Sequence, residues 1–147
     1  MVRSPHAVSA GYRAGMAVDY ELGGAVGDRE LTLMHAKAFG TASTSDIPWG
    51  DRLARHSIAW VVARDGDRLV GFVNVIGDGG AHAVLLDTVV EPEHQGRGVG
   101  RALVDRAASA ASDAGCEWLH VDYEPELADF YERVCGFRPT DAGLIRL

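Results

Sequence analysis

The residues from Glu91 to Arg101 have the composition of an anion-binding loop. They read EPEHQGRGVGR, with glycines at 96, 98 and 100 and arginines at 97 and 101. Glycine allows the backbone to come close to a ligand and leaves N–H groups pointing outward. A helix that starts here adds partial positive charge, and arginine adds charge-assisted contacts. The loop is therefore predicted to bind a phosphate group.

Two common nucleotide-binding patterns do not fit this loop. A Walker loop requires Gly-Lys-Ser/Thr, which the chain lacks. A dinucleotide fingerprint requires Gly-x-Gly-x-x-Gly/Ala, and its last position here is Arg101 or Leu103, depending on the first glycine counted. A glycine-rich turn without any ligand stays open as an alternative at this point.

The loop must be positioned by the elements on either side of it. Before it lie three segments rich in β-formers, separated by the turn sequences Asp65-Gly66-Asp67 and Gly77–Gly80, which predict an antiparallel meander. The predicted strands are Ser57–Ala63, Arg68–Ile76 and Ala81–Val90. Earlier in the chain we expect a strand over Arg13–Tyr20, a helix over Asp28–Phe39 and a short helix over Gly50–Arg55.

After the loop the apolar residues take a helical period. An alanine-rich stripe predicts a helix over Val99–Ala114, ended by Gly115, and Glu117–Tyr123 is predicted to be a strand. A second helix begins at Pro125, because Leu127, Phe130, Tyr131 and Val134 have helical spacing. Phe137–Leu147 is expected to form a terminal strand pair. The fold class is α/β: a single mixed β-sheet, with an antiparallel meander followed by β-α-β-α-β.

Composition limits the kind of protein. The chain has 147 residues, 47% of them hydrophobic, which predicts one globular domain over residues 1–147. A net charge of −7 argues against a nucleic-acid partner. Neither a secretory signal nor a membrane span is visible, and the two cysteines fit small buried residues in a reducing compartment, so we expect a cytoplasmic protein.

Two sequence elements resemble a known family. Gln95-x-x-Gly98-x-Gly100, after a strand that ends Thr88-Val89-Val90, is similar to the acyl-CoA signature of the GNAT superfamily of N-acetyltransferases. The segment Phe130–Phe137 is similar to the Phe-Tyr-x-x-x-Gly-Phe element of that family, with one extra residue before Gly136. The resemblance covers the chain from about Ser57 onward.

The resemblance implies that acetyl-CoA is the cofactor, as acyl donor. The histidines and cysteines have no metal-ligand spacing, so no metal is expected. Acetyl-CoA would lie in a V between two splayed parallel strands, Ala83–Val90 and Glu117–Tyr123. The main chain of Thr88, Val89 and Val90 would pair with the pantetheine arm. The pyrophosphate would be held by the N–H groups of Gln95, Gly96, Arg97, Gly98, Val99, Gly100 and Arg101. Transfer to an amine would be direct, through a tetrahedral intermediate.

Direct transfer to an amine needs a base and an acid. Tyr131 matches the tyrosine that protonates the departing thiolate in this family, and core packing is its alternative role. Asp87 is the only acid in its predicted strand, so we expect a catalytic or substrate-binding role for it, with a structural salt bridge as the alternative. His120 and Glu124 are candidate substrate contacts. Glu124 stands where the family often has asparagine, and a hydrogen-bonded core position is the alternative for His120.

The partner implied by these features is an amine acceptor, either a small molecule or a protein. Residues 117–132 contain six acidic and no basic side chains, which would suit a cationic acceptor. A homodimer is possible. Two other functions stay open: a catalytically silent acyl-CoA sensor, and an α/β domain that does not bind CoA.

Overall fold

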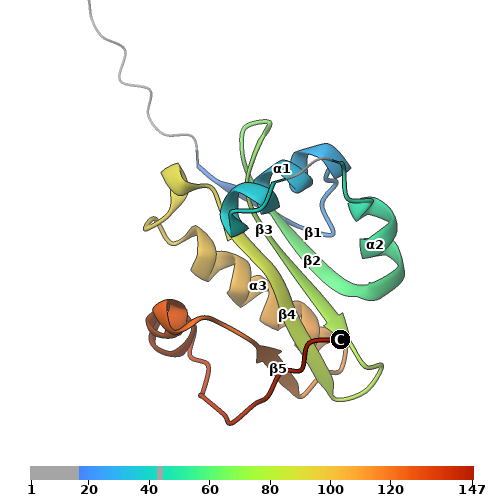
Figure 1. Ribbon diagram of the computed structural model, residues 1–147, viewed down its shortest axis with the longest axis vertical. Coiled ribbons are helices and arrows are strands. Elements are labelled where there is room, and N and C mark those ends of the chain that lie inside the picture. Colours follow the sequence, from blue (N-terminus) through green and yellow to red (C-terminus); the bar gives the residue numbers. More distant parts are fainter. Residues whose placement is uncertain (1–16, 43–44) are drawn as a thin grey trace, which may run out of the picture.

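The computed structural model describes residues 17–42 and 45–147 and shows a five-stranded mixed sheet with the order β1-β2-β3-β4-β5 (Figure 1). Strands β1 to β4 are antiparallel neighbours, and β5 pairs with β4 in parallel. The fold class predicted from the sequence is therefore confirmed. The strands are β1 (Asp19–Leu22), β2 (Ser57–Asp65), β3 (Arg68–Gly77), β4 (His82–Val90) and β5 (Trp118–Val121).

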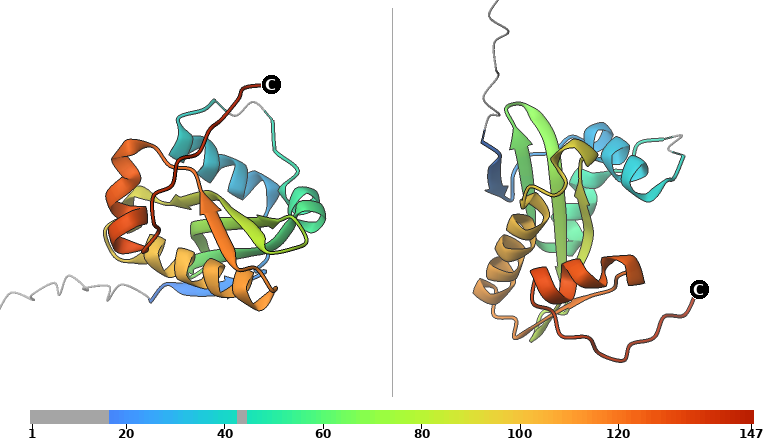
Figure 2. Two further views of the ribbon diagram at one scale, coloured as in Figure 1. Left: turned by 90° about the horizontal axis from the view of Figure 1, so that it is seen from below. Right: turned by 90° about the vertical axis from the view of Figure 1, so that its left-hand side faces the viewer.

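Helices cover both faces of the sheet (Figure 2). Helices α1 (Asp28–Phe39) and α2 (Trp49–His56) lie on one face, and α3 (Val99–Asp113) lies on the other. Gly71 makes room for α3, because a Cβ at this position would be 2.9 Å from Cδ1 of Leu103. Within the residues described, no helix is long and apolar enough to cross a membrane.

Each face of the sheet has its own apolar core. The core under α3 contains valines of β2 and β3 and the alanine stripe of α3, which allows close packing. The core under α1 and α2 is built around Trp49 and Phe72, both fully buried, with ring centroids 6.0 Å apart. These two cores fix the helices on β4, the strand that ends at the glycine loop.

Strands β4 and β5 pair over only part of their length. His82–Leu85 pairs with Trp118–Val121, and within the described residues no strand pairs with the rest of β4 on this side. The two parallel strands therefore separate beyond Leu85, as predicted. The separation leaves the main chain of residues 86–90 available on this side to a ligand.

A β-bulge interrupts β4 at the same place. Phe72 pairs with Val89 and Asn74 pairs with Leu86, so Asp87 and Thr88 together lie opposite a single residue of β3. Asp87 has a φ of 54°, the only non-glycine residue in the described chain with a positive φ. A non-glycine residue in this conformation costs free energy, and such residues concentrate at functional sites.

The end of the chain differs from the prediction. Residues 136–147 form no strand, although a terminal strand pair was expected over Phe137–Leu147. Leu144, Ile145 and Leu147 are at least 84% exposed, so their apolar side chains find no sheet face to cover. Pro139 also removes a backbone donor from any ladder. The predicted strand over Arg13–Tyr20 lies partly outside the described residues, and β1 starts only at Asp19.

The helix expected after Pro125 forms in two irregular pieces. A 3₁₀ turn, η2 (Pro125–Leu127), is followed by a π-helical segment, η3 (Asp129–Val134). The N–H of Cys135 donates to the carbonyl of Phe130 at 2.9 Å, a π-type bond that spans five residues. The one extra residue before Gly136 is accommodated in this wider turn.

Candidate active site

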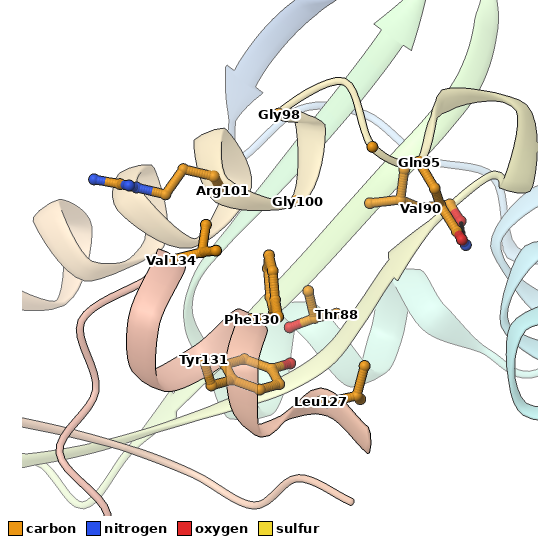
Figure 3. A pocket seen from close by; sticks show the side chains of 11 residues that line it. Thr88, Val90, Gln95, Gly98, Gly100, Arg101, Leu127, Phe130, Tyr131 and Val134 are labelled. Atoms are coloured by element: carbon orange, nitrogen blue, oxygen red, sulfur yellow. Dashed lines mark hydrogen bonds between the residues drawn. The ribbon is translucent and has the colours of Figure 1, made fainter. Parts of the chain in front are cut away.

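A pocket of about 520 Å³ lies where β4 and β5 separate (Figure 3). Its walls come from the end of β4, the glycine loop with the first turn of α3, and the segments η2 and η3. The lining residues are Thr88, Val90, Gln95, Gly96, Gly98, Gly100, Arg101, Leu127, Phe130, Tyr131 and Val134. Most of the lining side chains are apolar, and the polar groups lie at the glycine loop and where Thr88 meets Tyr131.

The glycine loop has the backbone conformation of an anion site. Gly96 and Gly98 have φ values of 71° and 82°, in the left-handed region that favours glycine, and Gly98 is the N-cap of α3. Val99, Gly100 and Arg101 form the first turn of α3, so their N–H groups have no acceptor within the helix. These donors and the helix dipole favour a phosphate at this end of the pocket.

Side-chain hydrogen bonds are present at both ends of the glycine loop. The Gln95 side-chain amide donates to the carbonyl of Val90 at 3.0 Å, which fixes the loop to the end of β4. Arg101 is held by Asp105, with Nε 2.8 Å from Oδ2. Arg97 is exposed and does not line the pocket, and the side chains of Val89 and Val99 are buried. For Val89 and Val99, main-chain contacts with a cofactor are therefore the ones consistent with their predicted roles.

The glycine at position 98 can be tested against a distant glycine of the same conformation. We expect Gly98→Ala to destabilise the fold by about 1 kcal/mol, since L-residues are disfavoured at this φ. It should also weaken acetyl-CoA binding by about tenfold or more, equal to about 1.4 kcal/mol, because a relaxed loop moves its donors. Calorimetric titration measures this affinity. Gly79→Ala, with a φ of 81° in the β3–β4 turn, should destabilise similarly and leave the affinity unchanged.

One wall of the pocket is the apolar stripe of η2 and η3. Leu127, Phe130, Tyr131 and Val134 all line it. Tyr131 also belongs to the core under α3, and Phe130 packs against that core, so the apolar stripe serves both the pocket wall and the core. Gly100 allows the close approach of this wall, because a Cβ there would lie 3.1 Å from the Phe130 ring. An apolar channel of this kind suits a pantetheine-like chain.

Tyr131 places a buried hydroxyl in the pocket. The residue is 6% exposed, and its ring stacks on Tyr123 with centroids 5.1 Å apart. Figure 3 shows the hydroxyl oxygens of Tyr131 and Thr88 facing each other. Burial raises the pKa of Tyr131 above its ordinary value near 10, and the neighbouring Thr88 hydroxyl lowers it to a lesser extent. The hydroxyl is therefore a proton donor at neutral pH.

Asp87 lies in a polar cluster on the α1–α2 face of β4. Its Oδ1 is 3.1 Å from Nε2 of His35, a residue of α1. Its Oδ2 accepts from Nδ2 of Asn74 at 3.4 Å and lies 3.6 Å from Nη2 of Arg52. Ser57 in turn donates to Oδ1 of Asn74 at 2.6 Å. With a side chain that is 12% exposed, Asp87 is nearly buried among these partners.

The bulge brings this cluster and the pocket to opposite sides of one short stretch of strand. Thr88 and Val90 line the pocket, whereas Val89 belongs to the core under α1 and α2. Asp87 contacts residues of α1, α2 and β3. A ligand in the pocket and a second ligand beside the cluster would meet at the separated end of β4, where β5 no longer fills the space.

Two predicted substrate residues lie elsewhere. His120 pairs with Val84 in the closed part of the sheet, and its Nε2 is 2.8 Å from Nδ1 of His82. Glu124 is exposed before η2 and does not line the pocket. Of the six acids between residues 117 and 132, Glu132 accepts from the Tyr123 hydroxyl and Asp129 pairs with Arg133. The substrate roles of His120 and Glu124 stay predictions.

Sequence reasoning missed the partners of Asp87. Asn74 offered a signal, because it is the single polar side chain in the interior of an apolar strand, and it is 1% exposed. His35 shares a helical face with Leu31 and Met34 in the sequence, and this spacing indicates core packing and no contact with β4. Its contact with Asp87 spans 52 residues of sequence, which local spacing does not reveal.

The same fold occurs in solved acetyltransferase structures. A probable acetyltransferase from Staphylococcus aureus has 19% identity and a TM-score of 0.73, covering 89% of this chain and 98% of that one. A GNAT family acetyltransferase from Streptococcus pneumoniae has 22% identity and a TM-score of 0.72, with the same coverage. An aminoglycoside N-acetyltransferase in complex with CoA has 16% identity and a TM-score of 0.71, covering 92% and 97%. The architecture is therefore that of the acetyltransferases in the GNAT superfamily.

The sequence itself establishes the family. A profile of the acetyltransferase (GNAT) family matches residues 29–137, and the chain belongs to this family. Serotonin N-acetyltransferase 2 of Oryza sativa is 36% identical over 90 residues, 58% of this chain and 44% of that protein. Mycothiol acetyltransferase of Nocardia farcinica is 34% identical over 98 residues, 64% of this chain and 31% of that protein. The match thus spans less than half the length of either relative.

Proposed function

We propose that this protein transfers an acetyl group from acetyl-CoA to a primary amine of a small molecule or a protein. The observation that carries the proposal is the pocket at the separated end of β4, which combines unpaired helix N–H groups, an apolar channel and a buried tyrosine hydroxyl. Family membership supports acetyl transfer, and the two relatives named above are acetyltransferases.

The pocket residues fit the parts of acetyl-CoA. The pyrophosphate suits the glycine loop, where donors from residues 95–101 and the start of α3 supply partial positive charge. The pantetheine arm suits the strip between Thr88–Val90 and the apolar wall of η2 and η3. Its amide groups would pair with the main chain of β4, and the thioester would then lie near Thr88 and Tyr131.

The reaction proposed is direct attack of the amine on the thioester. An alkylammonium, with a pKa near ~10, must first lose a proton. The amine nitrogen then forms a C–N bond with the carbonyl carbon, and the main-chain N–H near Val89 is a candidate donor to the oxyanion. The C–S bond breaks with its electron pair on sulfur. Tyr131 gives its proton to this thiolate and recovers one from the amide nitrogen, through solvent.

Two measurements on the purified chain test this proposal. Acetyl-CoA at 100 times its Kd should stabilise the folded state by about 2.7 kcal/mol. Release of free thiol from acetyl-CoA should depend on an added amine, screened with a panel of alkylamines, amino sugars and peptide amines. Absence of stabilisation at millimolar acetyl-CoA would contradict cofactor binding. Stabilisation without amine-dependent thiol release would instead favour the acyl-CoA sensor.

A further inference from the structure

We propose that His35 is the base that removes the proton from the acceptor amine, and that Asp87 is the positioning residue that orients it. This inference rests on the proposed function. It assigns a role to a residue of α1, far in sequence from the glycine loop, and it changes the role expected for Asp87.

Asp87 is poorly placed to accept a proton from an amine itself. One carboxylate oxygen is hydrogen-bonded to His35, and the other contacts both Asn74 and Arg52. The side chain is 12% exposed, whereas that of His35 is 23% exposed. An amine approaching from solvent on this face therefore reaches the imidazole more easily than the carboxylate. The left-handed φ of Asp87 holds the carboxylate toward α1 and α2 at a conformational cost.

The contact also determines which imidazole nitrogen is available. An ionised carboxylate can only accept hydrogen bonds, so Nε2 of His35, at 3.1 Å, must carry the hydrogen. In the neutral ring Nδ1 then has the free lone pair. In the part of the chain that the structure describes, Nδ1 has no hydrogen-bond partner.

Neighbouring groups hold the imidazole in this orientation. The ring lies 4.4 Å from the Phe39 ring and 5.3 Å from the Trp49 ring, measured between centroids. The charged groups that face it are Asp87 from β4 and Arg52 from α2, whose guanidinium lies 4.8 Å above the Trp49 ring. Lys37, on the same helix as His35, is paired with Glu91 at 2.7 Å. The imidazole is thus packed on its flanks and open toward solvent.

His35 and the pocket can act on one reaction because Asp87 and Thr88 are adjacent in the bulge. The ammonium would give one proton to Nδ1 of His35, which later releases it to solvent. The neutral nitrogen would then attack the thioester carbonyl from the α1–α2 side of β4. The C–S bond breaks on the opposite side, where Tyr131 protonates the sulfur. Overall, one ammonium and one thioester give one amide, one thiol and one proton.

The test compares two acceptors of similar shape and very different basicity, each variant being measured against the wild-type rate with the same acceptor. One is an alkylamine that the wild-type chain acetylates. The other is the matching alkoxyamine, in which oxygen replaces the CH₂ next to nitrogen and the amine is unprotonated at neutral pH. For His35→Gln we expect kcat/KM to fall by about 100-fold or more with the alkylamine and only a few-fold with the alkoxyamine. Free imidazole should partly restore the alkylamine rate of His35→Ala.

Controls separate this role from a structural one. His56→Gln replaces an exposed histidine at the end of α2 and should leave both rates unchanged. Thermal unfolding and stabilisation by acetyl-CoA should be preserved in His35→Gln. Equal losses with both acceptors, or no loss with either, would overturn the role of His35 while leaving the proposed function intact. A wild-type chain that acetylates no amine would overturn both.

Discussion

Replacing Tyr131 with phenylalanine should lower kcat by about 100-fold or more and leave the affinity for acetyl-CoA nearly unchanged. The change removes a single oxygen, whereas the ring, which stacks on Tyr123 and lines the pocket, stays in place. The departing thiolate then loses its proton donor, which slows the chemical step alone. Steady-state thiol release gives kcat, and calorimetric titration gives the Kd.

The matched control is Tyr123→Phe. Its hydroxyl donates to Glu132 at 2.8 Å and does not line the pocket, so kcat should be preserved. Because burial raises the pKa of Tyr131 above its ordinary value near 10, the hydroxyl keeps its proton at neutral and mildly alkaline pH, and kcat should not fall there through deprotonation of this residue. If Tyr131→Phe abolishes acetyl-CoA binding and spares kcat, the hydroxyl binds the cofactor and is not the acid.

Phe72→Ala should destabilise the protein by about 3–5 kcal/mol. Phe72 is fully buried beneath Trp49, in the core that fixes α1 and α2 on the sheet. Truncation leaves a cavity that the rigid sheet on one side cannot fill. Denaturant unfolding, followed by tryptophan fluorescence, gives the free energy of unfolding and its change.

An exposed phenylalanine provides the comparison for Phe72. Phe39 at the end of α1 is 54% exposed, and Phe39→Ala should cost no more than about 0.5 kcal/mol. Because the core around Phe72 also positions Arg52 and His35, acetyl transfer by Phe72→Ala should fall even at temperatures where the chain is folded. Similar losses of stability in both variants would show that the core under α1 and α2 is not tightly packed.

The regular elements were predictable because their signals are local. Turn sequences define the meander, helical spacing defines α1 and α3, and the glycines identify the loop that precedes α3. The family resemblance relates Thr88, Val90, several loop residues and Tyr131 to one ligand, and the structure places them around one pocket. Their roles stay predictions. Gly96 and Gly98 are the clearest case, because their conformation favours the residue type that the sequence supplies.

The bulge, the cluster around Asp87, the π-helical turn and the end of the chain depend on contacts between residues far apart in the sequence. Asp87 can adopt either an extended or a left-handed conformation, so the bulge becomes evident only when β4 is paired with β3. The cluster around it unites α1, α2 and β3, and the closest contact of the Asp87 carboxylate joins residues 52 positions apart. The π-helical turn reflects tertiary packing of Phe130 and Tyr131. The prediction of a terminal strand pair over Phe137–Leu147 was wrong, because apolar residues form a strand only where a neighbouring strand pairs with them.

The bulge in β4 also restricts which changes in chain length the protein can accept. Side chains alternate between faces along a strand, and the extra residue shifts this alternation by one position between Leu85 and Val89. Deletion of Asp87 would restore regular alternation from Leu85 to Val90 and leave Thr88 and Val89 on their present faces. A strand without the bulge would therefore keep the pocket and lose the carboxylate that contacts His35. The segment between Leu85 and the glycine loop can shorten by this residue only at the expense of the Asp87–His35 contact.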